Sequence, residues 1–336
     1  MPTLKRRSLD AAFACRIALF AVLAAPAAQA EWYHRVDDGI MGTRITVELW
    51  ADDPVQADRA IEAVLAEMRR VDELMSTYKP TSELSKVNAG AARHPVAVTP
   101  ELFHLLETSL EYSKVTEGAF DITYASVGYL YDFRKHVHPT EQAIEQALPG
   151  INYRHVLLDP AHSSVRFSQA GVRIDLGGIA KGHSVDRAIA LLEAMGIRHA
   201  AVSAGGDSRV IGDRFGKPWI IGIRNPRAAD PDAVITRIPL EDAAISTSGD
   251  YERYFEEGGV RYHHILDPKT GHSASKVLSA SIIGPTATRT DGLSKTAFVL
   301  GPEEALRIID KLDDVDAVFV TPDGRVLYSK GLEPPH

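Results

Sequence analysis

Apolar and polar residues recur along this 336-residue chain in patterns that predict both helices and strands. Over residues 54–75 the apolar positions return every three or four residues, which predicts an amphipathic helix. Residues 44–50 alternate with period two and predict a strand that follows a loop at 37–42. A second helix is expected to begin with Thr99 as its cap and Pro100 at its first position.

The stretch 173–187, RIDLGGIAKGHSVDR, is the centre of the predicted organisation. Alternating apolar residues over 172–176 predict a strand, which breaks at a pair of glycines before a helix expected from Ser184. A turn of this kind lets backbone groups approach an anionic or metal-bound ligand, and Asp175 and Lys181 supply one charge of each sign. Taken alone, the stretch fits an ordinary strand-to-helix connection with a surface lysine equally well.

The remaining patterns predict more strands than helices. Strands are expected at 153–158, 164–167, 199–203, 219–223, 243–246, 262–266 and 278–283, and helices at 141–148, 184–195, 291–300 and 302–312, with a hairpin turn at 322–324. Short turns join many of these strands, which favours an α+β arrangement over a strictly alternating parallel one. The chain contains no internal repeat and no low-complexity linker, so residues 31–336 are interpreted as one domain.

The first 30 residues have the pattern of an export signal. A basic start at 5–7 precedes an apolar run at 18–25, and Ala28-Gln29-Ala30 matches a small-x-small cleavage site. We therefore expect a mature periplasmic protein that begins at Glu31. The pair Arg6-Arg7 suggests twin-arginine export, but the residues after it match that signal poorly, which favours the general secretory route.

Charge and cysteine content exclude several functions. The predicted signal carries four basic residues and one acidic residue, so its removal would shift the formal net charge from −8 to about −11. A nucleic-acid partner is therefore not expected. Cys15 is the only cysteine and lies within the signal, so the mature chain would have no disulfide, thiolate metal site or cysteine nucleophile.

Several glycine- or acid-rich segments lie where elements are expected to start or end. The most specific are DLGGIAKGHSVD at 175–186, SAGGD at 203–207, HHILDPKTG at 263–271 and DGLSKTAFVLG at 291–301. Together and in this order, they resemble the FAD:protein FMN transferases, the ApbE-like flavin transferases, over essentially the whole mature chain. The resemblance implies a two-lobed α+β fold, T-fold-like, with mixed, mostly antiparallel sheets, packed helices and FAD held in a cleft between the lobes.

The resemblance also implies a reaction and its partners. Members of this family cleave FAD, transfer FMN through a phosphoester bond to a threonine or serine hydroxyl of a target protein, and release AMP. Such chemistry calls for Mg²⁺ or a similar cation to neutralise phosphate charge, and for a group that deprotonates the hydroxyl. The expected acceptor is a respiratory or other periplasmic redox protein, and peripheral association with a membrane-bound acceptor would follow from it.

Site residues follow from the resemblance position by position. The residues implied to contact FAD are Met41, Tyr78, Ala119, Phe120, Asp121, Asp175, Lys181 and Ile265. The metal would bind the carbonyl of Gly178, the carboxylate of Asp291, a group at Ser294 and the residue at position 295. His264 is the candidate catalytic base.

Position 295 departs from the family pattern, because Lys295 stands where a threonine is expected. A charged lysine cannot ligate Mg²⁺, so one ligand is missing, or Thr296 or water replaces it. This departure leaves open a non-catalytic periplasmic flavin-binding protein, which would need the same pocket with no metal. A second alternative keeps the site and changes the acceptor: with water in place of the hydroxyl, the protein would be an FAD pyrophosphatase that yields FMN and AMP. Zinc is disfavoured because His263, His264 and His272 are not spaced as usual ligand pairs.

Overall fold

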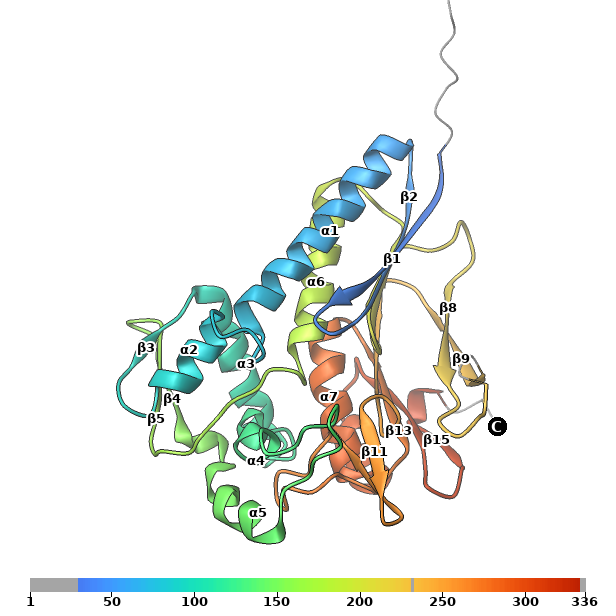
Figure 1. The fold of residues 1–336 in the computed structure, drawn as a ribbon. Coiled ribbons are helices and arrows are strands. Elements are labelled where there is room, and N and C mark those ends of the chain that lie inside the picture. The colour runs from blue at the N-terminus through green and yellow to red at the C-terminus, as the bar shows by residue number, and fades with distance from the viewer. Residues whose placement is uncertain (1–29, 231–232, 333–336) are drawn as a thin grey trace, which may run out of the picture.

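The computed structural model describes residues 30–230 and 233–332 (Figure 1). The export signal predicted at 1–30 lies outside the described residues except for its last position. Within the described ranges, no helix is both long and apolar enough to cross a bilayer.

Helices and strands alternate irregularly along the chain. The strands are β1 (Glu31–Ile40), β2 (Thr43–Ala51), β3 (Val96–Ala97), β4 (Val156–Asp159), β5 (Ser164–Phe167), β6 (Ala200–Ala204), β7 (Asp207–Ile211), β8 (Trp219–Arg224), β9 (Val234–Leu240), β10 (Ala244–Gly249), β11 (Tyr254–Glu257), β12 (Val260–His263), β13 (Ser279–Gly284), β14 (Asp316–Val320) and β15 (Val326–Tyr328). The α-helices are α1 (Pro54–Met75), α2 (Glu83–Gly90), α3 (Pro100–Val115), α4 (Ala125–Gly128), α5 (Glu141–Ala147), α6 (Ala180–Ala194), α7 (Ala287–Leu300) and α8 (Pro302–Ile309). Short 3₁₀ turns are η1 (Ile122–Tyr124), η2 (Leu148–Gly150), η3 (Tyr153–His155) and η4 (Lys330–Leu332).

An eight-stranded sheet forms the larger lobe, in the order β1-β2-β6-β7-β10-β13-β14-β15, and every neighbouring pair in it is antiparallel. Helices α1, α6 and α7 cover one face of this sheet, and the β8–β9 hairpin covers part of the other (Figure 1). The predicted α+β class with mostly antiparallel sheets is confirmed.

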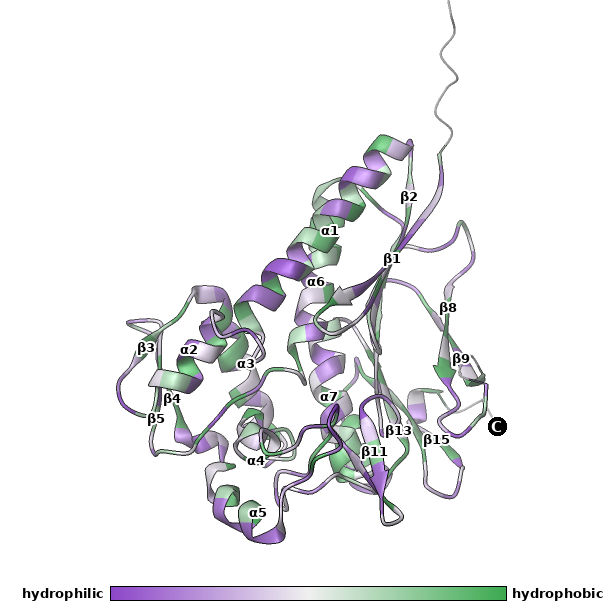
Figure 2. Ribbon diagram, viewed as in Figure 1, coloured by the Kyte–Doolittle hydropathy of each residue, from purple (hydrophilic) through white to green (hydrophobic). Residues whose placement is uncertain are grey.

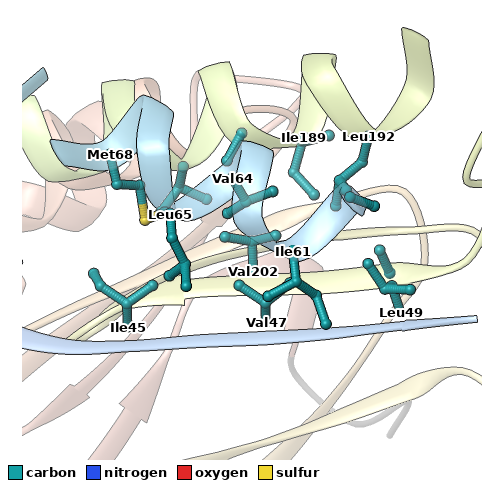
Figure 3. Packing of buried hydrophobic residues seen from close by; sticks show 14 of the residues in the cluster. Ile45, Val47, Leu49, Ile61, Val64, Leu65, Met68, Ile189, Leu192 and Val202 are labelled. Carbon is teal, nitrogen blue, oxygen red and sulfur yellow. The ribbon is translucent and has the colours of Figure 1, made fainter. Parts of the chain in front are cut away.

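The main core forms because α1 is amphipathic and β2 alternates. Figure 3 shows Ile61 of α1 beside Val47 of β2 and Leu65 of α1 over Ile45 of the same strand, with Ile189 pointing toward them from α6. These side chains are 4% exposed or less, and burial of each contributes about 1.5–3 kcal/mol. Hydrophobic and hydrophilic residues alternate along α1 in Figure 2, as this packing requires.

A smaller lobe is built from α2, α3 and the three-stranded sheet β3-β5-β4 (Figure 1). Its core includes the fully buried Leu102 and Leu106 of α3, Phe167 of β5, and Ile174 from the segment that leads into α6. Because that segment runs out of the small lobe into a helix on the large sheet, it joins the two lobes.

Residues 172–176 do not form the predicted strand. Buried and more exposed side chains nevertheless alternate along them, and Ile174 is fully buried. The backbone of Ile174 pairs with a side chain instead of a neighbouring strand. Its N–H donates to Asn88 Oδ1 and its carbonyl accepts from Asn88 Nδ2, both at 2.8 Å. A single asparagine thus satisfies the backbone groups that a sheet would otherwise pair.

Two helices begin one turn earlier than predicted. Helix α6 begins at Ala180 rather than near Ser184, and α7 at Ala287 rather than near Asp291. Asp186 of α6 explains the second difference, because its carboxylate accepts from the backbone N–H groups of Ala287 and Thr288 at 2.9 and 2.8 Å. Thr286, the N-cap residue of α7, also accepts from the Arg289 N–H at 3.4 Å. The start of the helix therefore depends on one local cap and on one contact from another helix, and only the local cap leaves a signal in the nearby sequence.

Other differences are smaller. Thr99 stands at the N-cap of α3, but its hydroxyl donates to Glu83 at 3.0 Å instead of capping the helix. The loop expected at 37–42 is mostly strand, since β1 extends to Ile40 and pairs with β2 through a two-residue turn. The predicted helix at 54–75 and strand at 164–167 agree with the structure. The elements that were not predicted include α2, α4, β1, β3, β7, β9 and β11.

Candidate active site

Helices α6 and α7 cross where Gly182 meets Asp291. A Cβ atom at position 182 would lie 2.6 Å from the carbonyl carbon of Ala287 and 2.8 Å from the Cβ of Asp291, so this approach needs glycine. The Gly182 N–H donates to Asp291 Oδ2 at 3.0 Å. Asp291 is fully buried, and its carboxylate is therefore held in one position between the two helices.

Strand β10 supports the same face of α7 through pairs of hydroxyl groups. Ser246 pairs with Thr290 and Ser248 with Ser294, each at an Oγ–Oγ separation of 2.8 Å. Residues 246–249 belong to β10, and their alternate hydroxyls face the helix. Ser294 also donates to the carbonyl of Asp291 at 2.8 Å.

Four buried or half-buried charges meet at this crossing. Lys295, one turn after Asp291, places its Nζ 2.5 Å from Asp291 Oδ1. Lys181, in the first turn of α6, forms an ion pair with Asp207 and lies 3.7 Å from Asp291 Oδ2. The predicted Asp291, Lys181 and Lys295 thus lie together, and two carboxylates are balanced by two ammonium groups.

The pairing sets the protonation states of this cluster. Burial opposes the charged form of Asp291, but Lys181 and Lys295 outweigh it and lower the pKa of that carboxyl. Burial likewise opposes a charged Lys181, yet Asp207 and Asp291 raise the pKa of its amine above the usual value. Both groups are therefore ionised at neutral pH.

Asp207 begins β7 after the Gly205-Gly206 turn, and it is 1% exposed. Its Oδ2 accepts from Lys181, whereas its Oδ1 is buried and accepts no hydrogen bond within the described residues. Burial and the charge of Asp291 raise the pKa of this carboxyl. The side chain thus faces the charge cluster and does not stabilise its own turn.

His264 follows β12 directly. Burial lowers the pKa of its imidazole to about 3, and the positive charges of Arg253, Lys295 and Lys181 act in the same direction. Its Nδ1 is buried and has no hydrogen-bond partner in the part of the chain that the structure describes. The ring is therefore neutral at neutral pH and retains a nitrogen able to accept a proton.

The small lobe contributes Asp175 and Tyr78. Asp175 Oδ1 accepts from Gly177 N–H at 2.6 Å and from the Tyr124 hydroxyl at 3.2 Å, and Oδ2 accepts from Thr77 at 2.8 Å. Tyr78, next to Thr77, is 82% exposed. An aromatic side chain this exposed is available to a ligand, and its implied contact with flavin stays a prediction.

The β1–β2 turn and Arg253 lie against each other. Met41 and Gly42 both have positive φ angles, 54° and 64°, which make the tight two-residue hairpin turn. Arg253 donates to the Gly42 carbonyl at 3.2 Å, and its positive charge acts on both His264 and Tyr124. Sequence reasoning missed Arg253, because nothing in its local sequence distinguishes it from a surface arginine.

The segment before η1 has mainly structural contacts. Asp121 is 6% exposed, and its carboxylate accepts from the Thr123 N–H and hydroxyl and from the Tyr153 N–H at 2.6–2.8 Å. Burial raises the pKa of this carboxyl. Ala119 and Phe120 are 4% and 5% exposed, so contact between these three side chains and FAD would need movement of this segment.

The side chains of Phe120 and Lys295 both pack against Gly178. A Cβ atom at position 178 would lie 3.3 Å from the Phe120 ring and 3.2 Å from Lys295 Cγ. This places the predicted glycine turn beside the charge cluster. Ile265, 6% exposed, is packed in the core next to His264, where its N–H donates to His263 Nδ1 at 3.3 Å.

The residues implied to bind a metal do not fit a divalent cation. Lys295 Nζ covers Asp291 Oδ1, and the same ammonium lies 3.3 Å from Ser294 Oγ. Among the described residues, no group of three or more histidine, cysteine or acidic side chains is arranged to hold a metal. We therefore derive no step of the chemistry through a metal ion.

Two cavities of about 440 and 340 Å³ lie away from these residues. One is beside α8 and the β14–β15 turn, and the other is beside β8, near Glu48 and Arg214. Neither of these two cavities is lined by any of the predicted site residues.

Comparison with known proteins gives a consistent family. The sequence model of the ApbE family matches residues 41–319. An FAD:protein FMN transferase of Treponema pallidum is 33% identical over 311 residues, which cover 87% of this chain and 86% of the relative. One of Haemophilus influenzae is 34% identical, with 81% and 82% covered.

Solved structures agree with the sequence comparison. The ApbE protein of Thermotoga maritima matches with a TM-score of 0.82 at 34% identity, covering 90% of this chain and 98% of that one. The flavin transferase ApbE of Vibrio cholerae matches with a TM-score of 0.77 at 30% identity and the same coverage.

Proposed function

This chain belongs to the ApbE family, and from that premise we propose that it is an FAD:protein FMN transferase. It would cleave FAD and attach FMN to a threonine or serine hydroxyl of an acceptor protein. The observation that carries the proposal is the cluster of cations where α6 meets α7. Lys181 pairs there with Asp207 and Lys295 with Asp291, and their charges act on His264, whose buried Nδ1 has no partner among the described residues. A proton acceptor next to several cations is the arrangement that phosphoryl transfer from a pyrophosphate needs.

The bonds that change are few. The acceptor hydroxyl oxygen forms a bond to the FMN phosphorus, and the bond from that phosphorus to the bridging oxygen breaks. AMP leaves with the bridging oxygen and its electron pair, and the hydroxyl proton passes to the imidazole of His264. No oxidant or reductant is needed.

Electrostatics connect the residues to this step. The pyrophosphate of FAD carries about two negative charges, which Lys181, Lys295 and Arg253 would offset during the transfer. The same negative charges would oppose the cations that depress the pKa of His264, and bound FAD would therefore raise that pKa from about 3. The base would become stronger when its substrate is in place.

The flavin half would lie toward the small lobe. Tyr78 offers an exposed aromatic face there, and the charge of Arg253 acts on Tyr124 as well as on His264. Met41, held at a positive φ in the β1–β2 turn beside Arg253, is a second implied flavin contact, from the edge of the large lobe. These contacts would bind the isoalloxazine ring while the large lobe holds the phosphates.

A further part of the proposal concerns the compartment in which the protein acts. The signal pattern at 1–30 supports export, and an exported transferase would meet acceptor proteins in the periplasm, including redox domains of membrane-bound respiratory complexes.

Two alternative functions use the same site. In an FAD pyrophosphatase, water would replace the acceptor hydroxyl, and a flavin-binding protein would leave FAD intact.

One experiment separates these functions. The mature protein is incubated with FAD, with and without a candidate acceptor that bears a threonine, and AMP, FMN and the acceptor mass are measured. AMP that requires the acceptor, together with an acceptor mass increased by one FMN unit, supports the transferase. AMP and free FMN without acceptor would show a pyrophosphatase, and intact FAD would show a carrier.

A further inference from the structure

We propose that the ammonium group of Lys295 takes the place of a divalent cation at Asp291, so that FAD cleavage by this chain does not require Mg²⁺. The inference rests on the proposed transferase function and concerns how its site handles phosphate charge. Lys295 follows Asp291 by four residues on α7, so both side chains lie on one face of the helix.

The first observation is the occupation of the Asp291 carboxylate. Its Oδ1 accepts from Lys295 Nζ at 2.5 Å, and its Oδ2 accepts from Gly182 N–H at 3.0 Å. Mg²⁺ would need to sit about 2.1 Å from one of these oxygens with near-octahedral geometry. An ammonium nitrogen this close to Oδ1 blocks that approach.

The second observation is the charge balance. Asp207 and Asp291 are matched by Lys181 and Lys295 in one buried cluster. With a neutral residue at position 295 the cluster would carry one excess negative charge and attract a cation. The positive charge of Lys295 cancels this excess and so removes the attraction for a cation. A divalent cation would then add two positive charges to a cluster whose charges are already balanced.

The third observation is that Lys295 retains a donor for phosphate. Its ammonium has three N–H groups, of which Asp291 Oδ1 and Ser294 Oγ engage two at 2.5 and 3.3 Å. The side chain is 16% exposed, and its stem packs against the glycine turn at Gly178. The remaining N–H can therefore reach a pyrophosphate oxygen that approaches along this turn.

A purely structural salt bridge would have the same geometry, so the test must measure metal use. FAD cleavage is measured in EDTA and in Mg²⁺ for the wild type, for Lys295→Thr and for Lys311→Thr, an exposed lysine that serves as control. Calorimetric titration with Mg²⁺ gives a second readout that does not depend on turnover. Lys295→Gln replaces the threonine variant if the latter does not fold by circular dichroism.

The proposal expects wild-type and Lys311→Thr turnover to be equal in EDTA and in Mg²⁺ within about twofold. Lys295→Thr should lose about 10²-fold in EDTA, recover with Mg²⁺, and bind Mg²⁺ where the wild type does not. Wild-type dependence on Mg²⁺, or calorimetric Mg²⁺ binding by the wild type, would overturn the proposal. A variant that gains neither Mg²⁺ binding nor Mg²⁺-dependent turnover would overturn it as well.

Failure of the transferase function itself gives a different result. In that case no protein would release AMP under any condition, with or without acceptor. Calorimetry would still decide the inference, because Mg²⁺ binding by Lys295→Thr and not by the wild type supports the substitution of ammonium for metal.

Discussion

The backbone N–H of Gly182 on α6 donates a 3.0 Å hydrogen bond to Asp291 Oδ2 on α7, across 109 residues of sequence. The bond exists because the two helices touch at a position without a side chain. It fixes the carboxylate that positions Lys295, so the packing of two helices and the electrostatics of the candidate site depend on the same residue.

Gly182→Ala should therefore destabilise the protein, although alanine normally favours a helix by about 1 kcal/mol over glycine. The added Cβ would lie 2.6 Å from the Ala287 carbonyl carbon, and relief of the overlap should cost about 1–3 kcal/mol. Urea unfolding measures this loss, and FAD cleavage should fall with it. Gly39→Ala is the control, because the nearest atom there is 3.4 Å away. Unchanged or increased stability of Gly182→Ala would contradict the close approach of the helices.

Tyr78→Ala should raise the KM for FAD more than it lowers kcat. The ring is 82% exposed, so its removal costs little core packing, and its aromatic face would bind flavin equally in the ground and transition states. Steady-state kinetics with a threonine-bearing acceptor gives the two constants, and FAD fluorescence titration gives binding directly. Tyr78→Phe, which keeps the ring, is the matched control and should retain the wild-type KM. An unchanged KM in Tyr78→Ala would remove this residue from the flavin site.

His264→Ala should lower kcat by about 10²-fold or more while FAD binding changes little, because a base acts only as the hydroxyl attacks. The Nδ1 atom, which no described residue contacts by a hydrogen bond, is free for that role. Asp250 is a poor substitute, since Arg227 binds its carboxylate at 2.5 and 3.0 Å. A variant that loses FAD binding but keeps its maximal rate would make His264 a binding residue, and Asp207 would become the next candidate for the base.

Local periodicity predicted the elements that carry their own signal. Helix α1 has one apolar stripe and a proline at its start, and its predicted bounds match the structure. Residues 172–176 also alternate, but their partner is the Asn88 side chain, which lies more than 80 residues away and left the same pattern that a strand leaves. Period-two burial therefore does not distinguish a sheet from an extended segment held by one side chain.

The residues of the candidate site also fall into those with a local sequence signal and those without one. Short motifs located Asp291, Lys181, Lys295 and His264, which the fold brings together. Arg253 and the capping role of Asp186 were not predicted, because each acts through a contact with a distant segment. Contacts of this kind are set by tertiary packing and carry no spacing that a sequence reveals.

Stability should depend on pH through His264. The folded pKa of about 3 lies below the ordinary value of 6.5, so between these values the unfolded chain binds one proton more than the native protein at this residue. Stability is therefore lost as pH falls from 6.5 toward 3, by about 1.4 kcal/mol per pH unit for one proton. His264→Asn should remove a slope of this size from the free energy of unfolding between pH 4.5 and 6, measured in urea.

His104→Asn is the matched control for this measurement, because the His104 side chain is 81% exposed and its loss should leave the slope unchanged. Equal slopes for wild type and His264→Asn would mean that the imidazole titrates alike in the folded and unfolded chains, and its burial among Arg253, Lys181 and Lys295 would then not set its charge. A slope removed by His264→Asn and retained by His104→Asn would show that the native site holds the neutral ring, which is the form that can accept the hydroxyl proton.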